Sequence, residues 1–150
     1  MEKNALTTIV AVLLILYSFA NFGASIGQFS KAKAVNGTSS LAASLGNYVG
    51  DKAGAAKIKL KGAMASGILH LFALFILVTA ILDITAAIGL FSGQSWTLAI
   101  LITAALFGIL VEIQDIAEDG FGIGKLIFLT INGLALFTAS LAKKQKLAYQ

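Results

Sequence analysis

Charged residues divide this chain into long apolar stretches. No charge occurs in residues 4–30, 62–82 or 84–111, and a last uncharged stretch covers 126–142. A helix that crosses a bilayer needs about 20 mostly apolar residues, at about 1.5 Å of rise each. The stretch 84–111 is too long for one such helix. Within it, Ser92-Gly93-Gln94-Ser95 replaces the apolar pattern with small polar residues, which predicts a turn.

The pattern predicts an all-α fold, an integral membrane four-helix bundle that forms one transmembrane domain. We expect helices at about 5–29, 64–91, 96–116 and 123–142. The last helix is short, but Lys125 and Lys143 can extend their ammonium groups toward water from its two ends. Trp96 opens the third helix, where an indole at the membrane interface is expected.

The first apolar stretch has a second interpretation, as a cleaved signal peptide. Met1-Glu2-Lys3 is a weak basic region, and Ser18-Phe19-Ala20 fits a cleavage site with small residues at its outer positions. We expect the stretch to be kept as a helix, which makes the chain a multi-pass membrane protein.

A lysine-rich loop is expected over residues 30–62, between the first two helices. It carries six lysines and one acid, Asp51. Some of its residues recur near helical spacing: Leu41, Leu45, Tyr48, Val49 and Ala56. With Ser39 or Ser40 as N-cap, they predict a short amphipathic helix on the lipid headgroups or against the mouth of the bundle. An irregular loop is an equally good interpretation.

The distribution of lysines bears on orientation. The long loop and the third connection share one side of the membrane and hold seven lysines, Lys125 among them. The other side holds four: Lys3, Lys143, Lys144 and Lys146. Because lysines favour the cytoplasmic side, we expect the long loop there and both termini outside. The basic tail at 143–146 argues the other way.

Composition supports the membrane and excludes several chemistries. The chain has 150 residues, of which 58% are hydrophobic and 12% charged, and its mean hydropathy is +0.90. A soluble domain of this size has too much surface to bury so many apolar side chains. There is no cysteine and one histidine, which excludes disulfides, thiolate metal sites and a bis-histidine haem. The net charge of +4 indicates lipid headgroups and topology, and we expect no nucleic-acid partner.

One level of the bundle is expected to be polar. Asp83 lies roughly 12 Å from the end of the second helix, by helical rise. Thr103 should lie opposite it, Asn132 should lie at nearly the same depth, and Ser18 is a further candidate. An ionisable group inside a membrane is costly and is a default functional candidate. The structural alternative is a protonated or hydrogen-bonded Asp83 that fixes helix packing.

A second group of ionisable residues is expected near the long-loop side. Glu112 and Asp115 share a helix face, Lys125 begins the last helix across a short turn, and His70 falls near their level. We expect an ion cluster that closes this end of the bundle. With one histidine and no E-x-x-H motif, a metal site is not expected, and we identify no catalytic residue.

Small residues at four-residue spacing are candidates for close helix contacts. Gly23 and Gly27 form one such pair, while Gly89 follows Thr85 and Gly108 follows Ala104 at the same spacing. Small residues let helix backbones approach closely, within the bundle or toward a partner.

The layout resembles the DoxX-type family of small four-helix membrane proteins. The shared features are Phe22-Gly23-Ala24 at the end of the first span, the loop with an amphipathic segment, and Ala-Ala-Ile-Gly-Leu at 86–90 before the turn. The resemblance implies association with quinone-reducing or oxidative-stress complexes. It transfers no catalytic residue to this chain.

The function expected first is that of an accessory or scaffold subunit of a larger membrane complex, without catalysis of its own. The partners would be the lipid bilayer and other membrane subunits. The alternative is a DoxX-like, quinone-associated or proton-linked membrane protein that uses Asp83. The sequence identifies no cofactor, although a quinone or another lipophilic cofactor fits the alternative.

Overall fold

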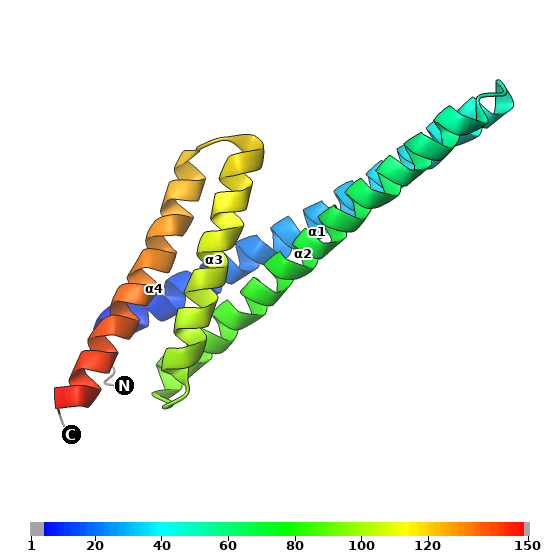
Figure 1. The fold of residues 1–150 in the computed structure, drawn as a ribbon. Coiled ribbons are helices and arrows are strands. Elements are labelled where there is room, and N and C mark those ends of the chain that lie inside the picture. The colour runs from blue at the N-terminus through cyan, green and yellow to red at the C-terminus, as the bar shows by residue number, and fades with distance from the viewer. Residues whose placement is uncertain (1–4, 149–150) are drawn as a thin grey trace. The chain divides into compact units, whose positions relative to one another are not determined.

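The computed structural model describes the backbone of residues 5–148 and the side chains of residues 5–143. Its regular elements, within these residues, are four α-helices (Figure 1): α1 Ala5–Tyr48, α2 Lys52–Ser92, α3 Thr97–Asp119 and α4 Ile123–Ala148. All four contain stretches long and apolar enough to cross a membrane. The all-α class and the four helices are as predicted, and α2 ends at the predicted turn.

The predicted loop over 30–62 is wrong, because α1 and α2 continue through it and only Val49, Gly50 and Asp51 connect them. Ser39 and Ser40 do not begin a helix there. Their hydroxyl groups donate to carbonyl oxygens one turn back in α1, Ser39 Oγ to Val35 O at 2.6 Å. Lysine, alanine and leucine are good helix formers, and the segment has no proline to interrupt the hydrogen-bond ladder.

The turn between α1 and α2 reverses the chain in three residues. Gly50 has a φ of +88°, a conformation that glycine adopts without steric cost. The Asp51 N–H donates to Gly46 O at 2.9 Å, which closes the end of α1. The Gly54 N–H donates to Asp51 Oδ1 at 2.8 Å, so Asp51 is the N-cap of α2.

The chain divides into two compact units. One comprises Met1–Phe22 and Ile76–Gln150, and the other comprises Gly23–Phe75. We call the first the bundle, because it contains parts of all four helices. We call the second the hairpin, because it contains the antiparallel second half of α1 and first half of α2.

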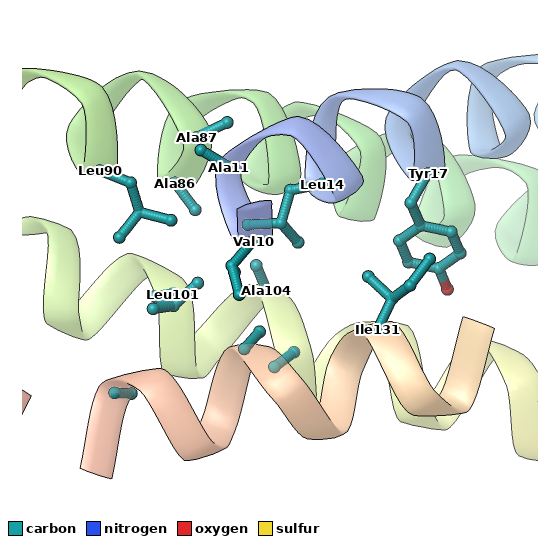
Figure 2. Packing of buried hydrophobic residues seen from close by; sticks show 13 residues of the cluster. Val10, Ala11, Leu14, Tyr17, Ala86, Ala87, Leu90, Leu101, Ala104 and Ile131 are labelled. Carbon is teal, nitrogen blue, oxygen red and sulfur yellow. The ribbon is translucent and has the colours of Figure 1, made fainter. Parts of the chain in front are cut away.

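Small and medium side chains fill the bundle core (Figure 2). Val10, Leu14 and Tyr17 of α1 pack with alanines and leucines of the other helices. The remaining members are Ala11, Ala86, Ala87, Leu90, Leu101, Ala104, Ala105, Ile131, Ala135 and Ala139. With so many alanines, the helices approach closely and interact by packing, as is typical of helices in membranes.

The hairpin is held together by still smaller side chains. The buried residues that face each other across it are alanine, glycine and serine, with Gln28 as the exception. Ser25 Oγ donates to Ala73 O at 3.1 Å, and Ser66 Oγ donates to Ala32 O at 3.0 Å. A Cβ atom added at Gly62 would collide with the Ser39 side chain, so the two helices meet at close range there.

Gly62→Ala should therefore loosen the hairpin. The added methyl group has to displace Ser39, and overpacking of this kind costs about 1–3 kcal/mol. Amide hydrogen exchange in residues 38–62 should rise about tenfold. Gly67→Ala is the matched control, because nothing lies within 4 Å of a Cβ atom at position 67. Equal exchange in the two variants would contradict the close packing.

Candidate functional site

Five buried polar side chains gather inside the bundle and come from all four helices. Tyr17 and Asn21 lie on α1, Asp83 on α2, Glu112 on α3 and Asn132 on α4. None of them is more than 4% exposed, and Asp83 and Asn132 are fully buried. We call these five residues the buried polar cluster. Polar groups removed from water are costly unless they are paired, so their partners decide what the cluster does.

Tyr17 is the centre of this cluster. Its hydroxyl donates to Glu112 Oε1 at 3.0 Å, and the side chains of Asn21 and Asn132 lie beside the same hydroxyl. Its ring packs against Phe128, with ring centroids 4.9 Å apart. Figure 2 shows Tyr17 pointing from α1 toward Ile131 of α4. One tyrosine thus connects α1 with α3 and α4.

Two oxygens of the cluster have no hydrogen-bond partner. Asn21 Nδ2 donates to Asp83 Oδ2 at a long 3.3 Å, while Asp83 Oδ1 has no partner. Asn132 Nδ2 donates to Phe128 O at 3.0 Å, and its Oδ1 is also unpartnered. Asp83 is therefore a buried carboxyl group with little compensation for a negative charge.

The predicted polar level is brought together only in part. Asp83 and Asn132 belong to the cluster. Ser18 follows Tyr17 in the sequence and is also buried. Its hydroxyl, however, donates within α1, to Ile15 O at 2.7 Å. Thr103 is exposed and donates to Ala99 O of its own helix at 2.9 Å. Thr103 therefore lies on a face of α3 that points away from the cluster.

Tyr17 and Asn21 were not predicted as site residues. A signal for them exists, because they are four residues apart and therefore share one face of a helix. A tyrosine and an asparagine on one face of an apolar helix predict a polar contact with a neighbouring helix.

The predicted ion cluster separates into three parts. Lys125 Nζ forms a salt bridge with Asp115 Oδ2 at 3.0 Å and donates to the carbonyl oxygens of Asp115 and Gly120, which closes the turn between α3 and α4. Glu112 is turned into the bundle, toward Tyr17. His70 belongs to the hairpin, where its Nδ1 lies 2.8 Å from Ser66 O and its ring lies 5.8 Å from that of Phe29. Among the described residues, no three His, Asp or Glu side chains gather as a metal site requires.

Lys125→Met should destabilise the turn between α3 and α4 modestly. The change removes a half-buried ion pair and two hydrogen bonds to carbonyl oxygens, worth about 1–2 kcal/mol together. Asp115→Asn should cost less, because Lys125 keeps both carbonyl contacts. Thermal unfolding in detergent measures the difference, with Asp119→Asn as the control at an exposed acid. A larger loss in Asp115→Asn than in Lys125→Met would contradict this order.

The candidate packing glycines differ in their surroundings. A Cβ atom at Gly89 would meet Thr97 and the Trp96 ring, and one at Gly108 would meet the Asn132 amide. Nothing lies within 4 Å of a Cβ atom at Gly23 or Gly27. Gly89 and Gly108 therefore permit close contacts inside the bundle, whereas Gly23 and Gly27 have open space around them.

Some of the lysines from which the orientation in the membrane was predicted fall outside the structure's description. Lys3, and the side chains of Lys144 and Lys146, lie outside the described residues.

No family model matches the chain, and neither does a curated protein or a solved structure.

Proposed function

We propose that the chain is an integral multi-pass membrane protein whose bundle conducts protons, which bind to and leave Asp83 and Glu112. The membrane part of the proposal is supported by four helices that are long and apolar enough to cross a bilayer. The observation that carries the rest is the buried polar cluster, which places two carboxyl groups inside the bundle. Ionisable groups in such positions commonly bind ions or relay protons.

Asp83 is suited to hold a proton. As a carboxylate it would be a buried charge with one long hydrogen bond from Asn21 and one oxygen without a partner. The desolvation of such a charge costs several kcal/mol, and protonation removes that cost. Deprotonation would then require a rearrangement that brings a donor or water to Asp83 Oδ1.

Glu112 complements Asp83, because it already accepts a hydrogen bond from Tyr17. The Tyr17 hydroxyl can change its donor and acceptor partners as the carboxyl group gains or loses a proton. Tyr17 and Asn21 lie one turn apart on α1 and contact different carboxyl groups, Glu112 and Asp83. This arrangement supports a function in which one face of α1 responds to the protonation of both carboxyl groups.

Proton movement into proteoliposomes tests the proposal. A potassium diffusion potential would drive protons inward, and a trapped pH-sensitive dye would report them. Asp83→Asn and Glu112→Gln should each lower the initial rate at least tenfold. Thr103→Val is the matched control, because Thr103 is exposed and bonds only within α3.

Wild-type protein no faster than empty liposomes would contradict the proposal. An unchanged rate in Asp83→Asn would contradict the role of that residue. Retention of helical circular dichroism and of a single gel-filtration peak separates loss of proton movement from loss of the fold.

A second function, an accessory subunit of a larger membrane complex, is favoured by the hairpin. Most of its large aliphatic side chains are exposed rather than packed between its two helices, whereas Phe29, Phe72 and Phe75 are half-buried. Exposed apolar surface of this extent commonly marks a site of interaction with another molecule. Purification in mild detergent, followed by identification of co-purifying chains, tests whether such a complex exists.

A further inference from the structure

The side of α1 that points away from α2 is exposed along the whole hairpin. The residues of α1 that pack against α2 are buried, among them Ser25, Ala32 and Ala43. The residues on the opposite side are spaced by three and four positions, so they share one helix face. We call this face the α1 edge. Toward the tip it carries Gly23, Gly27, Ser30, Ala34, Gly37, Leu41, Leu45 and Tyr48, all of them exposed.

The α2 helix has an exposed side of the same kind. Its residues that pack against α1 include Ala55, Gly62, Ser66 and Ala73, all buried. We call the opposite face the α2 edge. From the tip inward it carries Ala53, Lys57, Leu60, Met64, Ile68 and Leu71, all of them exposed. Because the two helices pack face to face, the two edges lie on opposite sides of the hairpin.

Contacts between the helices fix which residues of the two edges lie at the same height. Ser39 lies against Gly62. Since α1 runs toward the tip and α2 runs away from it, Leu41 is level with Leu60. The same count, made from the nearest contact in each case, makes Gly27 level with Leu71, Ser30 with Ile68, Ala34 with Met64 and Tyr48 with Ala53.

The two edges are complementary in size at equal height. Where the α1 edge carries the small residues Gly27, Ser30 and Ala34, the α2 edge carries leucine, isoleucine and methionine. Near the tip the relation is reversed, because Tyr48 of the α1 edge is level with Ala53 of the α2 edge. Large side chains that meet small ones allow two helices to approach closely.

A second copy of the chain would present these edges at matching heights. Copies that cross one bilayer in the same orientation hold corresponding residues at the same depth. The α1 edge of one copy would then face the α2 edge of the next, with large side chains against small ones. This contact would cover Tyr48, which is 90% exposed, and Met64 and Leu71, which are 62% and 70% exposed. Burial of such side chains stabilises a contact wherever they are in water.

Charge opposes the contact but does not lie along it. Residues 30–62 carry six lysines and one aspartate, a net charge of +5, so two copies repel each other. Of these lysines only Lys57 belongs to an edge as defined above. Repulsion between solvated charges is screened by salt, whereas apolar packing is not. A contact between copies should therefore become stronger as the salt concentration rises.

We infer that the α1 edge of the hairpin packs against the α2 edge of a neighbouring copy in the same membrane. The two edges differ and lie on opposite sides, so each pair of copies keeps one free edge at either end. Such a contact repeats, in a closed ring or an open row. The inference goes beyond both functions proposed above and does not depend on proton conduction.

Disulfide cross-linking tests the contact, because the natural chain has no cysteine. Two differently tagged full-length chains, one with Leu41→Cys and the other with Leu60→Cys, would be reconstituted together in liposomes and mildly oxidised. A dimer that carries both tags should form at least fivefold more than when Ser40→Cys replaces Leu41→Cys. Ser40 is the matched control, because it is exposed but lies about 100° around α1 from Leu41. Leu41→Cys in both chains should give little dimer, since the two edges differ.

A change of size on the α1 edge provides the second arm. Ala34→Leu in the Leu41→Cys chain should lower the mixed dimer at least tenfold, because it fills the space that Met64 of the neighbouring copy would enter. Ala63→Leu is the matched control, since Ala63 is exposed but lies off both edges. Proton movement should be unchanged in both variants, which separates failure of this inference from failure of the proton proposal.

Salt provides the third arm. An increase from about 50 mM to about 500 mM should raise the yield of mixed dimer at least twofold, because it screens the lysines. A yield that falls with salt would show attraction between charges and would overturn the inference. So would equal dimers from Ser40→Cys and Leu41→Cys, no mixed dimer, Leu41→Cys chains that link to each other as readily as to Leu60→Cys chains, or no effect of Ala34→Leu.

Discussion

Gly108→Ala is expected to lower the free energy of unfolding of the bundle by about 1–3 kcal/mol, and Gly108→Leu by more. Gly108 on α3 lies against Asn132 on α4. A Cβ atom at position 108 would stand 2.6 Å from Asn132 Nδ2 and 2.7 Å from its Cγ. Asn132 is fully buried, so its amide has no free space to enter. Alanine is a better helix former than glycine by about 1 kcal/mol, but the collision with Asn132 should still lower the free energy of unfolding. Reversible unfolding by SDS in mixed micelles measures it.

Gly133→Ala provides the matched control on the neighbouring helix. Nothing lies within 4 Å of a Cβ atom there, so this variant should be unchanged or up to about 1 kcal/mol more stable. Asn132→Ala introduced together with Gly108→Ala should recover part of the loss, because the two residues touch and their effects are not additive. If Gly108→Ala were as stable as Gly133→Ala, the close contact between α3 and α4 would be refuted.

Tyr17→Ala should cost about 3–5 kcal/mol, the range for an aromatic side chain removed from a core. Tyr17 is 1% exposed, packs against Phe128 and donates to Glu112. Tyr17→Phe keeps the ring but leaves the Glu112 carboxyl group without its donor, which should cost about 1–3 kcal/mol. The same SDS unfolding measures both variants. Tyr48→Phe is the control, because the Tyr48 side chain is exposed and its change should stay within about 0.5 kcal/mol.

A double-mutant cycle can separate the contribution of the Tyr17 hydroxyl from that of its ring. Tyr17→Phe and Glu112→Gln should be coupled by at least about 0.5 kcal/mol, because their side chains are bonded to each other. Additive losses would show that the hydroxyl acts elsewhere, for example on Asn21 or Asn132. In that case the packing of the ring, rather than the contact with Glu112, would account for the importance of Tyr17.

The helices of the bundle could be predicted because their limits are marked by charge and small polar residues. The turn after Ser92 and the start of α4 at Ile123 follow from such marks. The hairpin could not be predicted in the same way. Its lysines indicated a solvated loop, although lysine is a good helix former. Its contacts are made by alanine, glycine and serine, such as Gly62 with Ser39, and hydropathy does not detect contacts of that kind.

Asp83 and Asn132 could be selected from the sequence, but the face of each helix that points into the bundle could not be predicted. Asp83 and Asn132 were selected by their distance from the helix ends, and both are fully buried. The buried face of α3 carries Ala104, Gly108 and Glu112, and Thr103 lies about 100° around the helix from Ala104. Which face points inward depends on the packing of neighbouring helices, and no single apolar stretch contains that information.

The chain reversal at Val49, Gly50 and Asp51 has a consequence for how this architecture can grow. Its backbone hydrogen bonds are local, and its side chains are exposed. Extra residues at an exposed loop tip cost little closure entropy and leave helix contacts untouched. A whole folded domain inserted after Gly50 would therefore be carried by the two helices without repacking them, which makes this tip the natural point for a fusion.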